Sequence, residues 1–262
     1  MPTTPETPPF ISRRAFLGVG AAAFAAVALP LGSVHAGAMP LFGDGRLKAR
    51  PGTLTGSVRP GVSGLGLSTS PRDGLLRIPS GYRADQPAPL VMMLHGAGGS
   101  ARRAIQRLSG LADEAGHVLL AIDSRLATWD LLHGGFGPDV AFIDAALMSV
   151  FARCAIDPAR IAIEGFSDGA SYSLSLGLTN GDLFSRVIAF SPGFMNAGPL
   201  TGKPKVYISH GTADPILPID TCSRRIVPEL KRRGYDVSYH EFNGGHVVPA
   251  DQARNAVTWI AG

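Results

Sequence analysis

Apolar and polar positions along the chain repeat with two alternating periods. Short apolar runs of strand length are separated by longer stretches in which apolar positions recur at helical spacing. Strands are predicted at 75–79, 90–94, 118–122, 161–163, 187–190, 206–209 and 237–242, and helices at 101–115, 140–153, 170–178, 219–233 and 250–260. This alternation predicts the α/β class, with one mostly parallel central sheet covered by helices on both faces. Functional groups are then expected at the carboxyl ends of the strands.

The N-terminal stretch differs from the rest of the chain. Residues 12–17, Ser-Arg-Arg-Ala-Phe-Leu, resemble a bacterial twin-arginine export signature, and an apolar run over 15–31 follows. We expect a signal peptide at 1–36, an extended Gly- and Pro-rich segment at 37–74, and one α/β domain at 75–262. The expected location is the periplasm or the cell exterior, and no membrane span is expected after the signal. An uncleaved signal would anchor the protein, because its apolar run reaches the lower limit for crossing a bilayer.

The charge balance narrows the range of partners. The chain of 262 residues has 24 basic and 20 acidic side chains, a formal net charge of +4, and its short basic runs fit solvated helix faces. Such a mild excess predicts no nucleic-acid partner, and the absence of phosphate-loop and metal-ligand spacings predicts no cofactor and no metal. Cys154 and Cys222 are expected to be separate buried thiols, although an oxidising compartment would also permit one bridge.

The pentapeptide Gly165-Phe166-Ser167-Asp168-Gly169 lies between a predicted strand and a predicted helix. A serine on such a turn projects above the sheet, and the two flanking glycines remove side chains that would collide with neighbouring backbone. The helix start also directs free N–H groups toward the same place. Ser167 is therefore the candidate nucleophile, and the alternative is a serine that only caps the helix.

A serine nucleophile needs a base, and the base needs an acid that orients it. Asp214 follows one predicted strand in a loop, and His246 lies in a glycine-rich loop after the next strand. The order Ser, Asp, His along the chain is typical of α/β-hydrolases. The alternative role for Asp214 is to cap a turn. His240 is a rival base, but its position within a strand disfavours it.

Two backbone amides are candidates for an oxyanion hole, which stabilises the tetrahedral intermediate of acyl transfer. One belongs to Asp168, directly after the nucleophile, and the other to Ala97 in the His-Gly-Ala-Gly-Gly loop at 95–99. His95 is expected to tie this loop together by a side-chain hydrogen bond rather than to act in catalysis. Glu164 is a charge within an apolar strand, and it needs a partner that the sequence does not identify.

The segment at 124–138 carries more apolar side chains than a solvated connection needs. They are Leu126, Trp129, Leu131, Leu132 and Phe136. The segment either lines the substrate pocket or packs down as an ordered loop, because pocket walls and cores use the same residue types. Trp129 and Phe136, with Ile216 from the loop after Asp214, are the candidate substrate-binding residues. Phe194 and Met195 carry the same ambiguity.

These motifs together resemble the phospholipase and carboxylesterase branch of the α/β-hydrolase superfamily over residues 75–262. The matching motifs are His95-Gly96, the pentapeptide around Ser167, His210-Gly211 through Asp214-Pro215, and Gly245-His246. The resemblance implies a triad of Ser167, Asp214 and His246, an oxyanion hole from the Ala97 and Asp168 amides, and carboxylic esters or thioesters as substrates. Polyester depolymerases and feruloyl esterases are similar too.

The expected function is an exported serine esterase that forms an acyl-enzyme on Ser167 from a small ester. The chain departs from the acyl-protein thioesterases of this branch, which usually carry Gln-Gly where it has Asp168-Gly169, so their substrates do not transfer. No span is long enough for a large cap domain, which favours an open site. A thioester or amide hydrolase with the same triad stays open, as does a non-catalytic ligand-binding scaffold. Acyl-chain preference and oligomeric state are not fixed by the sequence.

Overall fold

The computed structural model describes residues 43–261. The strands are β1 (Gly61–Gly64), β2 (Gly74–Ile78), β3 (Ala88–Leu94), β4 (Val118–Ile122), β5 (Ile156–Phe166), β6 (Arg186–Phe190), β7 (Lys205–Gly211) and β8 (Val237–Phe242). The helices are α1 (Ala101–Gln106), α2 (Ser109–Glu114), α3 (Pro138–Arg153), α4 (Asp168–Thr179), α5 (Ser223–Arg232) and α6 (Ala250–Ala261), with a 3-10 turn η1 (Asp130–His133).

One sheet contains all the strands, in the order β1-β2-β4-β3-β5-β6-β7-β8. The pairs β1/β2 and β2/β4 are antiparallel, whereas every pair from β4 to β8 is parallel. All residues of β3 and β4 are buried, because a strand covered on both faces has no polar side. The prediction of an α/β fold with a mostly parallel sheet is confirmed, and residues 43–261 contain no separate cap domain.

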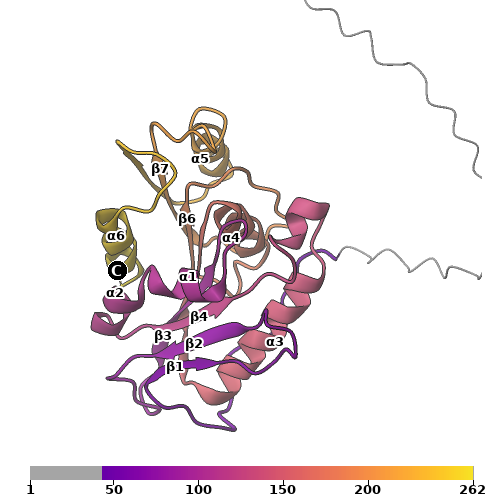
Figure 1. Ribbon diagram of the computed structural model, residues 1–262, viewed down its shortest axis with the longest axis vertical. Coiled ribbons are helices and arrows are strands. Elements are labelled where there is room, and N and C mark those ends of the chain that lie inside the picture. Colours follow the sequence, from indigo (N-terminus) through magenta and orange to yellow (C-terminus); the bar gives the residue numbers. More distant parts are fainter. Residues whose placement is uncertain (1–42, 262) are drawn as a thin grey trace, which may run out of the picture. The chain divides into compact units, whose positions relative to one another are not determined.

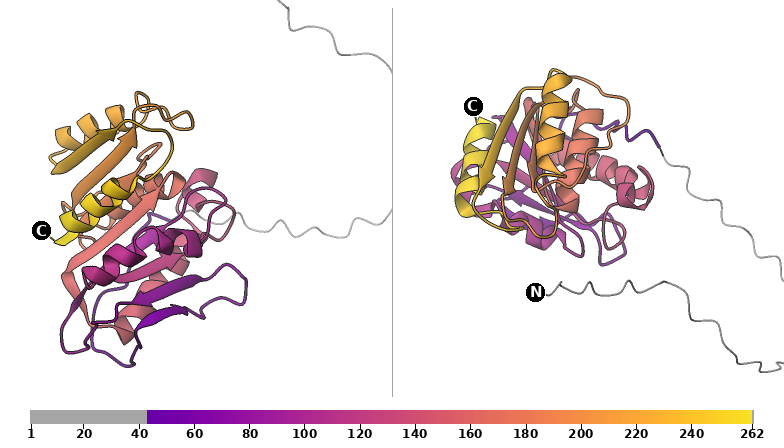
Figure 2. Two further views of the ribbon diagram at one scale, coloured as in Figure 1. Left: turned by 60° about the vertical axis from the view of Figure 1, so that its left-hand side comes forward. Right: turned by 90° about the horizontal axis from the view of Figure 1, so that it is seen from above.

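Helices cover both faces of the sheet (Figures 1 and 2). On one face, α1, α2 and α6 pack through side chains such as Ile105 and Val257. On the other, α3, α4 and α5 pack through side chains such as Leu147 and Leu174. In the view from above in Figure 2, α5 and α6 lie on opposite sides of the strands. This three-layer arrangement leaves the carboxyl ends of the parallel strands free to carry a site.

The predicted helix at 101–115 forms as two short helices instead of one. α1 ends before Arg107 and α2 begins at Ser109. The Ser109 hydroxyl donates to the Ile105 carbonyl, and the Ser-Gly pair at the start of α2 has weak helix propensity. Arg107 is the C-cap residue of α1, and its side chain reaches the sheet, where it bonds Glu164 of β5.

The predicted extended segment opens the described part of the chain and holds one short strand, β1. Arg46 donates to the Asp182 carboxylate at 2.9 and 2.8 Å, and the Asn180 side chain bonds the backbone of Gly45 and Leu47, so this segment is fixed beside the end of α4. The predicted signal peptide and residues 37–42 lie outside the described residues. Within residues 43–261, no helix combines the length and the apolar character needed to cross a membrane.

A ladder of hydroxyl groups on α4 holds the segment that follows β6. The ladder consists of Ser171, Ser175 and Thr179, which are spaced by four residues and so lie on one face of the helix. Their oxygens accept main-chain N–H bonds of 2.9 Å each from Gly193, Asn196 and Gly198, respectively. Phe194 and Met195, which lie between the first two rungs, are half-buried against the core.

Candidate active site

The pentapeptide forms the predicted turn between β5 and α4. Ser167 has φ +59° and ψ −122°, a conformation that residues with a Cβ rarely adopt. A Cβ on Gly165 would collide with the Gly169 carbonyl, and one on Gly96 would come within 3.2 Å of the Ser167 Cβ, so glycines make room for this turn. The Ser167 N–H donates to the Phe190 carbonyl at 2.9 Å, and this bond extends the sheet ladder to the serine.

The three residues predicted to form the triad are joined by hydrogen bonds. The Ser167 hydroxyl donates to His246 Nε2 at 2.9 Å, and Nδ1 of the same ring donates to Asp214 Oδ2 at 2.6 Å. Asp214 Oδ1 accepts N–H bonds of 2.9 Å each from Ile216 and Leu217. This geometry can pass a serine proton to an imidazole whose tautomer is set by a carboxylate.

Hydrogen bonds keep Asp214 ionised. Burial by itself raises the pKa of Asp214, but bonds from the Leu217 N–H, the His246 ring and the Ile216 N–H outweigh it, so the pKa lies below its ordinary value. His210 lies beside the same carboxylate, with 3.3 Å between Nε2 and Oδ2. Burial lowers the pKa of His210, and its Nε2 donates to the Leu217 carbonyl at 2.8 Å. A neutral His210 thus supports the loop that carries Asp214.

The two amides predicted for the oxyanion hole have no acceptor among residues 43–261. Ala97 lies in the exposed part of its loop. Its neighbour Gly96 packs closely against Ser167. Asp168 is the first residue of α4, where N–H groups have no partner within the helix. Its carboxylate accepts a bond of 2.7 Å from the Thr128 hydroxyl, a contact that sequence reasoning missed. Both amides are free to donate to a ligand, and their role stays a prediction.

His95 holds its own loop, in agreement with the role expected for it. Its Nδ1 donates to the Gly96 carbonyl at 2.7 Å, and its Nε2 accepts from the Ser124 N–H at 3.0 Å. Burial lowers the pKa of His95, which fits the neutral ring that these two bonds require. The ring is 1% exposed and has no contact with the Ser167 hydroxyl among its hydrogen bonds.

Glu164, whose partner the sequence did not identify, pairs with Arg107. Arg107 donates from Nε to Oε1 at 3.0 Å and from Nη2 to Oε2 at 3.3 Å, and Nη2 also donates to the Leu94 carbonyl at 3.0 Å. The guanidinium carbon lies 5.9 Å from the centre of the Phe166 ring, which packs against the His246 ring at 4.7 Å. Glu164 is fully buried, and burial raises its pKa while Arg107 opposes the rise.

Two of the three predicted substrate-binding residues are core residues instead. Trp129 is completely buried, with its ring centre 5.0 Å from those of His95 and Tyr172, and its Nε1 donates to the His95 carbonyl at 2.9 Å. Phe136 is 4% exposed and packs edge-on against Tyr172 at 5.7 Å. The segment at 124–138 therefore packs down as an ordered loop, because its rings fill the space beside α4. Ile216 is 65% exposed beside Asp214 and stays a candidate substrate contact.

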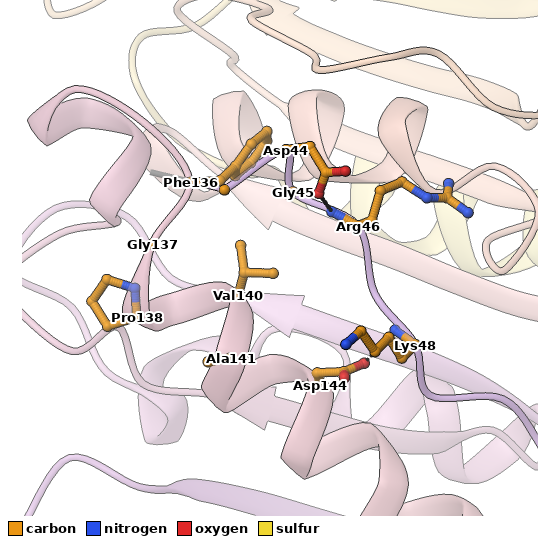
Figure 3. Close-up of a pocket in the computed structure, with 11 residues that line it drawn as sticks. Asp44, Gly45, Arg46, Lys48, Phe136, Gly137, Pro138, Val140, Ala141 and Asp144 are labelled. Atoms are coloured by element: carbon orange, nitrogen blue, oxygen red, sulfur yellow. Dashed lines mark hydrogen bonds between the residues drawn. The ribbon is translucent and has the colours of Figure 1, made fainter. Parts of the chain in front are cut away.

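A cavity of about 550 Å³ lies between the extended N-terminal segment and the start of α3 (Figure 3). Phe136 and Val140 line it from one side, and Lys48 and Asp144 lie at its other end. None of the residues predicted to form the triad or the oxyanion hole lines this cavity. Phe136 thus borders this cavity, which Ser167, Asp214 and His246 do not line.

The remaining sequence expectations concern metals and thiols. Within the described part of the chain, no group of three or more His, Cys, Asp or Glu side chains is arranged to hold a metal ion. Cys154 and Cys222 are separate buried thiols, as predicted. Burial raises the pKa of Cys154 to about 11, so this thiol is protonated at neutral pH.

Comparison with known proteins finds esterases. The Phospholipase/Carboxylesterase family profile matches residues 140–261. A protein named "Probable feruloyl esterase C" from Aspergillus oryzae is 31% identical over 157 residues, which cover 57% of this chain and 57% of that protein. The chain therefore spans little more than half the length of this curated relative.

Solved structures give the same picture of the fold. The crystal structure of esterase PE8 has a TM-score of 0.58 at 23% identity and covers 73% of this chain and 99% of that one. The fluorophosphonate-binding serine hydrolase FphF from Staphylococcus aureus has a TM-score of 0.60 at 16% identity, with 78% and 100% covered. The described chain has the α/β-hydrolase fold, and its match to the phospholipase/carboxylesterase family falls on the part that carries Ser167, Asp214 and His246.

Proposed function

We propose that this chain is a serine esterase of the phospholipase/carboxylesterase branch, with Ser167 as nucleophile, His246 as base and Asp214 as the acid that orients the base. The observation that carries the proposal is the pair of hydrogen bonds, 2.9 Å from Ser167 to His246 and 2.6 Å from His246 to Asp214. The three side chains come from three separate loops, each at the carboxyl end of a parallel strand, where ligands bind in sheets of this kind.

In the acylation step, Ser167 Oγ attacks the ester carbonyl carbon while its proton moves to His246 Nε2. The ionised Asp214 stabilises the imidazolium that forms. The negative charge that develops on the carbonyl oxygen is stabilised by the amides of Ala97 and Asp168. The C–O bond to the alcohol then breaks, and the leaving oxygen takes the proton from His246, which leaves an acyl group on Ser167.

In the second step, water takes the place of the alcohol. His246 Nε2 accepts a proton from this water as its oxygen attacks the acyl carbon, and the same amides stabilise the second oxyanion. Collapse of the intermediate returns the proton to Ser167 Oγ and releases the carboxylic acid. The two steps together consume one ester and one water and release one alcohol and one carboxylic acid, and every proton transfer runs through His246 Nε2.

Carboxylic esters with small or medium acyl groups are the proposed substrates. The absence of a cap domain from the described part of the chain supports an open site, and the exposed Ile216 beside Asp214 is a candidate contact for the substrate. The name of the Aspergillus oryzae relative makes feruloyl esters the first to be assayed. The twin-arginine signature at 12–17 supports export of the enzyme, so we propose that it acts in the periplasm or outside the cell.

Covalent labelling with a fluorophosphonate tests the mechanism. We expect mass spectrometry to find the label on Ser167, and Ser167→Ala to lose several powers of ten in kcat on aryl esters. Ser63→Ala, a change on the exposed strand β1, should keep wild-type kcat and labelling. A label found elsewhere, or wild-type turnover by Ser167→Ala, would overturn the proposal. Esters, thioesters and amides that share one acyl group would then rank the three hydrolase activities.

A further inference from the structure

We infer that the tripeptide Ala127-Thr128-Trp129 is a clamp that positions both oxyanion-hole amides. The Ala127 carbonyl accepts from the Gly98 N–H at 2.8 Å, and Trp129 Nε1 donates to the His95 carbonyl at 2.9 Å. Between these two, the Thr128 hydroxyl donates to Asp168 Oδ2 at 2.7 Å. Three consecutive residues therefore bind both segments that supply the proposed oxyanion donors. The inference rests on the proposed function.

The first donor, the Ala97 amide, lies between two residues of its loop that the clamp binds. The Ala97 N–H shares a planar peptide group with the Gly96 carbonyl, so whatever fixes that carbonyl also fixes the direction of the N–H. The carbonyl accepts from His95 Nδ1 at 2.7 Å and from the Gly99 N–H at 3.0 Å. The clamp bonds His95 and Gly98, the residues on either side of this peptide group, and so fixes the place of the loop relative to the turn at Ser167.

The second donor, the Asp168 amide, is fixed through its own side chain. Thr128 binds the carboxylate of Asp168, which otherwise has no hydrogen-bond partner among residues 43–261. That carboxylate is attached to the residue whose N–H faces the developing oxyanion. The bond from Thr128 holds the Asp168 carboxylate on the side of the clamp and partly compensates its negative charge. Loss of the hydroxyl leaves a carboxylate that is free to approach and repel the oxyanion.

The clamp is itself rigid. The Trp129 ring packs between those of His95 and Tyr172, each 5.0 Å away, and is completely buried. The next residue, Asp130, donates its N–H to Asp139 at 2.7 Å and accepts the Tyr172 hydroxyl at 3.0 Å. The packing holds the Trp129 indole in place, and its N–H in turn positions the 95–99 loop. Trp129 and Thr128 are therefore positioning residues.

Substitution of the two clamp side chains tests the inference. Thr128→Val removes the hydroxyl at nearly constant shape, Thr128→Ser restores a hydroxyl, and Trp129→Phe removes only the indole N–H and one ring. Thr221→Val is the control, because the Thr221 hydroxyl makes a local bond to Pro218 at an exposed position. For each variant we would measure kcat and KM on an aryl ester and the inhibition constant of phenylboronic acid, which forms a tetrahedral adduct with a serine nucleophile.

Complete loss of an oxyanion donor costs about 100-fold or more in kcat, so a loosened donor is expected to cost about tenfold. We expect Thr128→Val and Trp129→Phe to lower kcat with little change in KM and to weaken phenylboronic acid binding by a similar factor. Thr128→Ser should recover most of the loss, and Thr221→Val should match the wild type. A merely structural role would lower the melting temperature and the fraction of labelled enzyme without changing kcat per labelled site.

The inference fails if kcat per active site is unchanged in Thr128→Val, or if KM rises instead. If Thr128→Val does not fold, unchanged kcat and boronic acid affinity in Trp129→Phe overturn it. Fluorophosphonate labelling separates this failure from that of the proposed function. A wild-type chain that does not label at Ser167 refutes the esterase mechanism, whereas a labelled and active wild type with indifferent clamp variants refutes only the clamp.

Discussion

The buried pair of Arg107 and Glu164 predicts an asymmetric response to mutation. The Glu164 side chain is 0% exposed, whereas that of Arg107 is 15% exposed. Arg107→Met leaves a carboxylate with no partner and no route to water, which costs about 3–5 kcal/mol. The lost bond to the Leu94 carbonyl adds about 1 kcal/mol. For a domain of this size, about 2–4 °C per kcal/mol gives a fall in Tm of about 10 °C or more.

Glu164→Leu should lower the free energy of unfolding by less than Arg107→Met does. The Arg107 guanidinium that remains keeps its bond to the Leu94 carbonyl and reaches solvent. The double variant Arg107→Met/Glu164→Leu replaces the pair by apolar groups of similar size and should be more stable than Arg107→Met alone. Urea unfolding at pH 7, followed by circular dichroism, measures all four proteins. The coupling energy of the cycle is expected to be at least about 2 kcal/mol.

The pH dependence of unfolding gives an independent test of the same pair. Burial raises the pKa of Glu164, and Arg107 opposes that rise, so removing Arg107 moves the folded-state pKa further above the unfolded value of about 4.3. A group with a raised folded-state pKa stabilises the protein below its unfolded pKa, and this stability is lost as pH rises through the folded pKa. Arg107→Met should therefore regain stability between pH 7 and pH 5, and the double variant should not.

Two results would refute this reasoning. One is an equal loss of stability in Arg107→Met and Glu164→Leu, which would mean that exposure does not decide the cost of an unpaired charge. The other is a double variant whose loss equals the sum of the two single losses, because additivity means that the two side chains are not coupled.

Three further predictions concern the turn at Ser167, a buried acid and the thiols. Gly165→Ala should abolish soluble, active protein because its Cβ would collide with the Gly169 carbonyl, whereas Gly110→Ala, with open space around it, should leave Tm unchanged or slightly higher; melting curves of both decide this. Burial raises the pKa of Asp139 to about 6, so its stabilising effect is present below about 3.9 and lost as pH rises through 6. Asp139→Asn should remove that slope, at most about 3 kcal/mol, in urea unfolding from pH 4 to 8. Both cysteines should resist Ellman's reagent in the native protein and react after unfolding, and equal gel mobility with and without reductant should show that no bridge links them.

Local patterns predicted most elements because most strands are apolar on both sides. β4 and β8 match the predicted ranges at both ends. β5 begins at Ile156, five residues before its predicted start. The sequence does not reveal this first part, because residues 158–160 are exposed and form no apolar run. Within it, Ile156 pairs with Ala88 of β3, and the register shifts before Ile161 pairs with Leu90.

The candidate site also has a part that the sequence predicts and a part that it does not. Ser167, Asp214 and His246 stand in short motifs at strand ends, so topology alone brings them to one edge of the sheet. Arg107 and Glu164 are 57 residues apart and lie on different elements, so no local pattern in the sequence pairs them. Trp129 was misassigned because an aromatic residue in a loop has the same sequence signature in a core and in a pocket.

The hydroxyl ladder on α4 makes the segment after β6 tolerant of change. Its hydroxyl oxygens accept hydrogen bonds from main-chain N–H groups, which every residue except proline provides. These bonds therefore do not depend on which side chains stand at positions 194 and 195. The first rung, Ser171, is one helical turn from Ser167, so the segment after β6 and the candidate nucleophile share α4 as a common support. Substitutions at Phe194 and Met195 are therefore expected to leave both the path of this segment and the turn at Ser167 in place.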